Sequence, residues 1–114
     1  MERGRSGRGV IVTYLKELRD VIRRVHGVEA TYVESVPVKE IFQGRTVWEG
    51  VVEVFDLIGH PTAARVYAWS HDTNDPANPT RHVTVLHSHP IRTAQDAVRA
   101  AIVQEFRNLG TEES

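Results

Sequence analysis

Five of the six histidines in this 114-residue chain lie between positions 60 and 89. They are His60, His71, His82, His87 and His89. Histidine is the side chain that most often binds metals or moves protons near neutral pH. The last three fall within RHVTVLHSHP, which otherwise alternates like a β-strand. This cluster is the first place to look for chemistry.

Two of these histidines have the spacing of a chelating pair. His87 and His89 would lie on one side of a strand, and His71 is a third candidate ligand if its own strand faces the same way. Three nitrogen or oxygen ligands with one open position can hold zinc or iron and activate a water. No HExxH or other diagnostic spacing accompanies the pair. The sequence therefore predicts no cofactor, with a divalent metal at these three histidines as the alternative.

Other catalytic patterns are incomplete. The chain has no cysteine, which excludes disulfides, thiolate metal sites and cysteine nucleophiles. No serine lies in a nucleophile elbow. Glu49 and Glu53 would form an acid–base pair only beneath a pocket. The sequence leaves an enzymatic role open and favours a protein that is not an enzyme.

A basic N-terminal segment raises the possibility of a nucleic-acid partner. Arg3, Arg5 and Arg8 lie among glycines, and the basic charge continues into the following residues. Such an arm attracts phosphates, and bases could stack on Tyr67 and Trp69 if these rings face outward. The net charge of −1 and the acidic stretch 27–57 count against this interpretation. Nucleic-acid binding is thus an alternative that the sequence does not favour.

Apolar periodicity predicts the elements that must position these residues. An amphipathic helix is expected from about Val10 to His26, ended by Gly27. A second helix is expected after Pro90, with Thr93 as its N-cap and Gly110 at its end. Between them, β-like segments cover about 30–42, 46–57, 63–71 and 81–89, and the first contains Pro37, which suits an edge strand.

These elements predict a fold and a domain division. Short connections favour antiparallel neighbours, so the predicted fold is α+β in the order α-β-β-β-β-α, a four-stranded antiparallel meander sheet with two helices packed on one face. We expect a flexible basic arm over 1–9, a single domain over 10–110 and a disordered tail over 111–114. No apolar run approaches a membrane span and no signal-peptide pattern is present, so we expect a cytoplasmic location and no membrane partner.

The faces of the strands point to a partner surface. Trp48, Val52 and Val54 share one face of their strand, and if both helices cover that face, several apolar side chains remain outside. They are Val51, Phe55, Tyr67, Trp69 and Leu86. Such a patch usually binds a partner, most commonly a second copy, unless the tail or the first strand folds over it. A rival assignment turns Tyr67 and Trp69 inward, because they bury more area than their neighbours.

Taken together, these features predict a small non-enzymatic binding or assembly domain that self-associates through a partly apolar outer sheet face. The first alternative is a small metal-assisted enzyme with a His-x-His site at the end of the fourth strand. The second is a nucleic-acid-binding module that uses the arginine-rich arm and the sheet aromatics.

Overall fold

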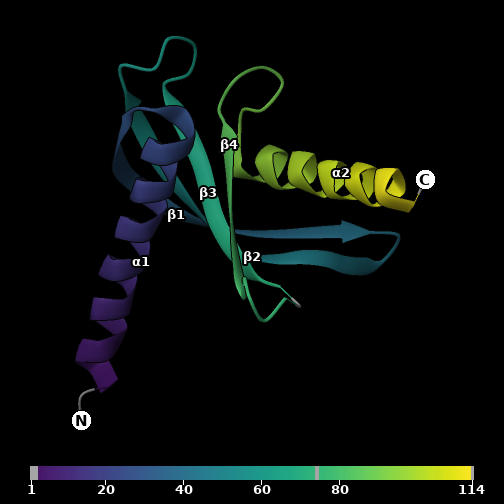
Figure 1. The fold of residues 1–114 in the computed structure, drawn as a ribbon, viewed down its shortest axis with the longest axis horizontal. Helices are drawn as coiled ribbons and strands as arrows, with labels where there is room; N and C mark the ends of the chain where they lie inside the picture. The colour runs from purple at the N-terminus through teal and green to yellow at the C-terminus, as the bar shows by residue number, and fades with distance from the viewer. Residues whose placement is uncertain (1–2, 74, 114) are drawn as a thin grey trace.

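The computed structural model describes residues 3–73 and 75–113, with side chains described over 12–73 and 75–105. Its elements are α1 (Arg3–His26), β1 (Glu29–Phe42), β2 (Arg45–Ile58), β3 (Arg65–Asp72), β4 (Thr80–Leu86) and α2 (Ala94–Glu113). The four strands pair antiparallel in the order β1-β2-β3-β4 (Figure 1). The predicted α+β class, the α-β-β-β-β-α order and the open meander sheet are confirmed.

The turns and helix ends follow from a few local residues. Gly27 has a φ of 74° and donates its N–H to the Arg23 carbonyl at 2.9 Å, which ends the packed part of α1 as predicted. Gln43 and Gly44 both have positive φ, the conformation of a tight two-residue hairpin turn. Thr93 caps α2, because its hydroxyl accepts the Asp96 N–H at 3.1 Å.

Both helices are longer than the sequence predicts. Helix α1 begins at Arg3, inside the segment expected to be a flexible arm, and α2 continues past Gly110 to Glu113, into the segment expected to be a tail. The predicted starting point near Val10 and the predicted end at Gly110 are therefore wrong. One glycine in a helix costs only about 1 kcal/mol, so it does not by itself stop a helix.

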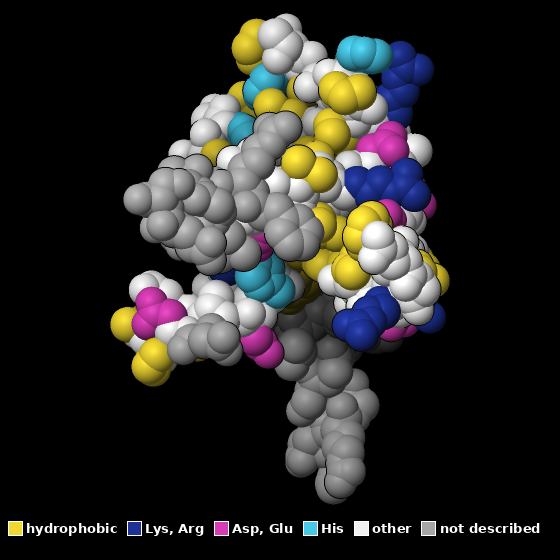
Figure 2. All heavy atoms as spheres, turned by 90° about the vertical axis from the view of Figure 1, so that its right-hand side faces the viewer, with side chains coloured by type: hydrophobic (Ala, Val, Ile, Leu, Met, Phe, Trp, Pro, Cys, Tyr) yellow, Lys and Arg dark blue, Asp and Glu magenta, His cyan; other side chains and the backbone are white. Residues whose placement is uncertain are grey.

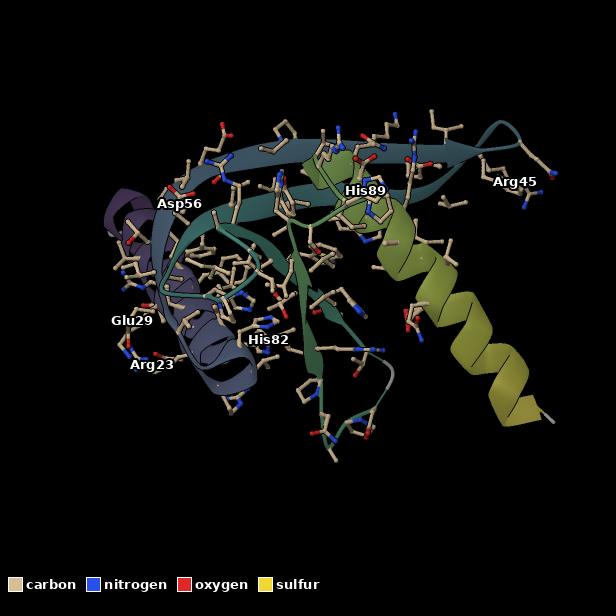
Figure 3. All side chains as sticks on the ribbon, turned by 90° about the horizontal axis from the view of Figure 1, so that it is seen from above. Arg23, Glu29, Arg45, Asp56, His82 and His89 are labelled. Atoms are coloured by element: carbon tan, nitrogen blue, oxygen red, sulfur yellow. The ribbon has the colours of Figure 1, made fainter. Side chains whose placement is uncertain are left out.

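The two helices lie on opposite faces of the sheet, so the prediction of both helices on one face is wrong. Leu18 and Ile22 of α1 pack in one cluster, and Ala97 and Val98 of α2 pack in another. The sheet residues in the first cluster are Phe55, Leu57, Val66 and Ala68, and those in the second include Val52, Val54, Tyr67 and Trp69. Adjacent residues of a strand point to opposite faces, so the two sets separate the two faces. In the view of Figure 3, α1 and α2 lie on either side of β4.

The hairpin of β1 and β2 extends beyond the rest of the sheet (Figure 1). Only residues 53–56 of β2 pair with β3, whereas β2 pairs with β1 along its whole length. Residues 36–42 and 45–52 therefore form a two-stranded extension, which we call the ribbon. An isolated two-stranded ribbon is marginally stable in water, so the ribbon needs support from other elements.

Helix α2 supports one face of the ribbon. Val38 and Trp48 pack in the α2 cluster, and the Trp48 ring lies edge-on to that of Trp69 at 5.6 Å. Two residues after Val38, the Glu40 carboxylate accepts a 2.9 Å hydrogen bond from the Nε–H of Arg99 and another hydrogen bond from the Gln95 side chain. The hydrogen bond from the Gln95 side-chain amide, and then the Arg99 guanidinium, hold the pKa of Glu40 below its ordinary value. This face of the ribbon is thus anchored by packing and by charge.

Candidate functional site

A buried tyrosine, Tyr67, positions His87. The Tyr67 hydroxyl lies 2.6 Å from Nδ1 of His87 and donates to the Arg92 carbonyl at 3.0 Å. A carbonyl oxygen can only accept a hydrogen bond, so the Tyr67 O–H points to the Arg92 carbonyl oxygen. Nδ1 of His87 therefore carries a hydrogen and donates it in a hydrogen bond to the Tyr67 oxygen. Nε2 of a neutral His87 is then left with a free lone pair. Burial raises the pKa of Tyr67, which keeps this hydroxyl protonated.

The three predicted metal ligands are not brought together. Strand β4 ends at Leu86, so His87 and His89 lie in the connection to α2 rather than on one side of a strand. His71 lies opposite Arg81 in the β3–β4 register and its Nδ1 faces the carbonyl of Asp72 at 3.1 Å. The described residues contain no group of three or more His, Asp or Glu side chains able to hold a metal ion. Within this part of the chain, His71, His87 and His89 therefore do not form a three-ligand metal site.

The sixth histidine, outside the sequence cluster, makes a contact that the sequence did not indicate. The ring of His26 in α1 lies edge-on to His60 at 6.3 Å, and its Nε2 forms a 3.0 Å hydrogen bond with the Thr84 hydroxyl of β4. Burial, and then the charge of His60, lowers the pKa of His26. Nδ1 of His60 accepts the N–H groups of Thr62 and Ala63 at 3.1 and 3.0 Å. These two histidines join α1 to the sheet.

His82 lies on the same side of the sheet, beneath α1. Its Nε2 atom is buried without a hydrogen-bond partner, and the nearest carboxylate, Glu17 Oε1, is 3.8 Å away. A buried imidazole nitrogen without a partner is uncommon and often marks a position that a ligand or a partner group satisfies. Figure 3 shows His82 between α1 and β4.

The predicted outer face does not exist as one surface. Phe55 is fully buried and Leu86 is partly buried, both within the α1 cluster. Tyr67 and Trp69 are 3% and 2% exposed beneath α2, so the rival assignment with these aromatics turned inward is the correct one. Of the five predicted residues, only Val51 is exposed, at 47%. The sheet faces next to the helices are occupied within one chain.

Among the described residues, the ribbon has one face that neither helix covers. Val51 points away from α2, because its neighbour Val52 points toward it. Val47, which is 44% exposed, lies at the register shift between β1 and β2, and we group it with Val51 by its exposure. Pro37 lies opposite Val51 in the register, and Lys39 lies opposite Glu49. We call these five residues the open face of the ribbon: Pro37, Lys39, Val47, Glu49 and Val51. Figure 2, which faces the free end of the ribbon, shows hydrophobic and basic side chains next to each other at that end.

The two glutamates considered as an acid–base pair have different surroundings. Glu53 is 6% exposed, and its carboxylate accepts a hydrogen bond from the Ser35 hydroxyl. Ser35 in turn lies 2.6 Å from the hydroxyl of Tyr32. Glu49 is exposed on the open face. The pair is therefore not enclosed by a common pocket, and Glu53 belongs to a polar contact between β1 and β2.

The side chains of Arg3, Arg5 and Arg8 lie outside the part of the chain whose side chains are described, so the nucleic-acid prediction stays a prediction. Further along α1, Arg23 donates two bonds of 2.8 Å to Glu29, and Lys16 pairs with Asp20 at 3.2 Å. These pairs neutralise part of the basic surface of α1. Among the described helices, none is long and apolar enough to cross a bilayer.

A comparison of the chain with protein-family models, with curated proteins and with solved structures finds no match. The function must therefore be inferred from the surfaces and contacts of the chain itself.

Proposed function

We propose that this protein is a small non-enzymatic assembly domain that self-associates through the open face of the ribbon, most simply as a twofold dimer. The observation that carries the proposal is the one-sided support of the ribbon. Helix α2 covers one face of this two-stranded extension, while Val47 and Val51 on the other face are exposed. Covering that face would stabilise an element that is marginal by itself.

The distribution of exposed apolar side chains supports this location. Ten large hydrophobic side chains are exposed among the described residues, and seven of them lie on β1 and β2. They are Tyr32, Val33, Ile41, Phe42, Val47, Val51 and Ile58. Single exposed apolar residues are ordinary, but their concentration on one hairpin favours this hairpin as the partner surface.

The charges on the open face favour a second copy as the partner. Lys39 and Glu49 are opposite each other in the register and point to the same face. A twofold axis over this face would place Lys39 of each copy near Glu49 of the other, because a twofold interface uses the same surface on both subunits. The face is therefore self-complementary in charge as well as apolar.

Sedimentation velocity over a range of protein concentrations tests the proposal. We expect a dimer at micromolar concentration and a dissociation constant raised about tenfold or more in Val51→Glu, which adds a charge beside Glu49. Ile58→Glu is the matched control, since Ile58 is 61% exposed against 47% for Val51 and lies on the same strand but outside the ribbon. A monomeric wild type, or equal dissociation in both variants, would overturn the proposal.

A charge exchange gives a sharper test of the twofold arrangement. Lys39→Glu and Glu49→Lys should each weaken the homodimer, because each creates two repulsive contacts across the axis. A mixture of the two variants should form a heterodimer, in which both contacts are attractive again. Circular dichroism of each variant checks that it is folded. Folded variants whose mixture is as monomeric as its components would contradict this arrangement.

The two alternatives, a metal-assisted enzyme at His87 and His89 and a nucleic-acid-binding module, remain predictions that no contact among the described residues favours. We also propose that the protein is cytoplasmic, as expected from the sequence.

A further inference from the structure

The outer edge of β4 carries backbone groups that the sheet does not use. Strand β4 is the last strand, and His87 donates its N–H to the Arg65 carbonyl at 2.9 Å, which continues the β3–β4 ladder. Because backbone groups alternate in an antiparallel ladder, those of the odd-numbered residues of β4 bond to β3. The N–H and C=O groups of His82 and Thr84 therefore point outward, and no described backbone group bonds to them.

The two outer edges of the sheet differ in their protection. At the opposite edge, β1 contains Pro37, which has no N–H, and its register with β2 shifts at two points. Prolines and bulges are features that keep an edge strand from pairing with another chain. Strand β4 has neither, since its register with β3 runs without a shift over all seven residues of the strand. The β4 edge is therefore the one of these two edges at which a strand can add.

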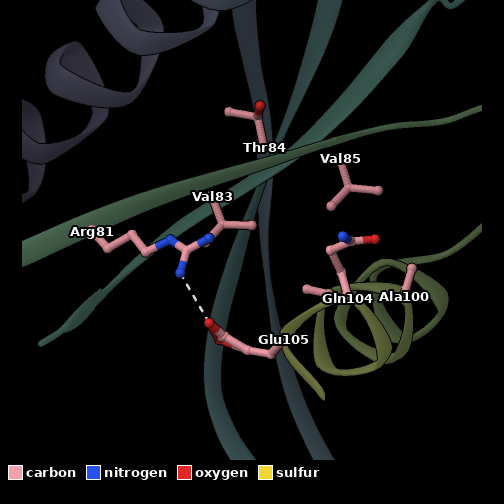
Figure 4. A pocket seen from close by; sticks show the side chains of 8 residues that line it. Arg81, Val83, Thr84, Val85, Ala100, Gln104 and Glu105 are labelled. Carbon is pink, nitrogen blue, oxygen red and sulfur yellow. Dashed lines mark hydrogen bonds and ion pairs between the residues drawn. The ribbon is translucent and has the colours of Figure 1, made fainter. Parts of the chain in front are cut away.

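A small apolar hollow follows this edge on the side of α2 (Figure 4). It has a volume of about 190 Å³ and lies between Val83 and Val85 of β4 and Ala100 and Ala101 of α2. The alanines leave room that larger side chains would fill. A strand that adds to β4 can therefore bury apolar side chains in this hollow.

The charge along the edge is balanced within the chain. Arg81 carries the one permanent charge of β4, and it donates to Glu105 of α2 at 2.9 Å. The centre of the strand, Val83, Thr84 and Val85, consists of β-branched residues, which pair well across neighbouring strands. The edge thus suits an uncharged, β-branched strand, and β4 itself has this composition.

We propose that β4 pairs with β4 of a second copy, antiparallel about a twofold axis at Val83. In this register all seven residues of the strand are paired, and His82 lies opposite Thr84 of the other copy, so that outward-pointing backbone groups meet. Val83 lies opposite Val83, and Arg81 lies opposite Val85 rather than a second cation. The edge is therefore complementary to itself in hydrogen bonding and without repulsion between charges.

Edge pairing and the ribbon contact use different strands, so one chain can make both. The edge contact does not depend on the ribbon, whereas the larger assembly described next rests on the proposed function. A ribbon dimer presents two β4 edges, and their pairing would continue the sheet from one dimer to the next. A single pair of seven-residue strands is a small contact, so we expect it to form at higher concentration than the ribbon dimer.

Sedimentation velocity of the wild type and of Val51→Glu separates the two contacts. We expect the wild type to pass from dimers to larger species between about 10 μM and about 1 mM. Val51→Glu, in which the ribbon contact is weakened, should pass from monomer to dimer over the same range. A Val51→Glu protein that stays monomeric would overturn edge pairing, leave the ribbon proposal standing and assign the edge to a strand of another protein. A Val51→Glu protein that associates as strongly as the wild type would support edge pairing and overturn the ribbon proposal instead.

Two substitutions at Thr84, both made in Val51→Glu, test the backbone contact. Thr84→Pro removes the outward N–H, which β3 does not use, and an edge strand accepts proline at such a position. Thr84→Val is the matched control, because it keeps the N–H and, like proline, removes the hydroxyl that is hydrogen-bonded to His26. We expect the dissociation constant to rise about tenfold or more with proline and less than about twofold with valine. Equal dissociation constants in the two variants, each shown by circular dichroism to be folded, would contradict the proposal.

Residue-resolved amide hydrogen exchange of Val51→Glu tests the same contact without altering the edge, so it does not require the proline variant to fold. A rise in protein concentration should protect the amides of His82 and Thr84. Those of Val83 and Val85 already bond to β3 and should not change. Exchange at His82 and Thr84 that is independent of protein concentration would refute edge pairing.

Discussion

Replacing Tyr67 by phenylalanine removes one oxygen from the centre of the contact between β3 and the α2 connection. The ring itself is 3% exposed and would stay packed beneath α2. Two hydrogen bonds are lost, the 2.6 Å bond that the hydroxyl accepts from Nδ1 of His87 and the 3.0 Å bond that it donates to the Arg92 carbonyl. The variant therefore isolates the polar contribution of Tyr67 from its packing.

The expected cost follows from these two bonds. Each intramolecular hydrogen bond contributes about 0.5–1.5 kcal/mol net, so the pair contributes about 1–3 kcal/mol. His87 is only partly buried and Arg92 is exposed, so water can replace part of what each loses. We therefore expect Tyr67→Phe to lower the free energy of unfolding by about 1–2 kcal/mol. Tyr32→Phe is the matched control, because the Tyr32 hydroxyl is exposed, and should change stability by less than about 0.5 kcal/mol.

Urea unfolding, with an m-value equal to that of the wild type, measures the loss in free energy of unfolding. The ¹⁵N chemical shifts of the His87 ring report which of its nitrogens carries the proton. In the wild type at a pH where His87 is neutral, the proton should reside on Nδ1. In Tyr67→Phe the acceptor is gone, and the proton should move to Nε2, the form that a free imidazole prefers. An equal loss of stability in the two phenylalanine variants would refute the assigned geometry. A proton on Nε2 of His87 in the wild type would refute it as well.

Three further outcomes are expected. Ile22→Ala should cost about 2–5 kcal/mol in urea unfolding because this fully buried side chain joins α1 to the sheet, whereas Val25→Ala on the exposed side should cost less than about 0.5 kcal/mol; similar losses would mean that α1 does not pack by this face. Glu40→Gln should speed amide exchange in residues 36–42. In the wild type, the stabilisation by Glu40 should be present above its ordinary pKa near 4.5 and be lost as the pH falls through its lowered folded pKa. In the variant, amide exchange corrected for intrinsic rates should not depend on pH over that range. His26 also has a lowered pKa, so the unfolded chain binds more protons and stability should fall as the pH drops below about 6.5; a His26→Gln variant with the same pH slope would contradict this.

Local features of the fold could be predicted from the sequence because local chemistry determines them. Gly27 and Gly44 adopt the positive φ that few other residues tolerate, and Thr93 supplies the oxygen that a helix start requires. Strand alternation placed Trp48 with Val52 and Val54, as the α2 cluster has them. Such signals act within a few residues, and the element order follows from them.

The side on which each helix packs could not be predicted in the same way. The predicted sheet has helices on one face alone, yet β3 contains an unbroken apolar run of Val66, Tyr67, Ala68 and Trp69. Such a run is typical of a strand buried on both faces, so the signal for two cores was present. The wrong partner face followed from this assumption, since Phe55 lies under one helix and Trp69 under the other.

The histidine contacts depend on long-range packing that spacing does not report. His87 and His89 look like a chelating pair only while the strand continues through them, and β4 ends before both. His26 meets Thr84 at a separation of 58 residues, with no local pattern to indicate it. The face of α1 that packs on the sheet brings this histidine there, so the contact follows from the tertiary structure alone.

The two separate cores make the intrinsic fluorescence of this protein selective. Its two tryptophans, Trp48 and Trp69, both lie in the α2 core, whereas Tyr14 packs against the α1 core, where its hydroxyl accepts the Ser70 N–H at 3.0 Å. Tryptophan emission therefore reports the opening of one side of the sheet and is blind to the other. Coincident melting curves from tryptophan emission and from far-ultraviolet circular dichroism would show that the strands couple the two cores into one cooperative unit.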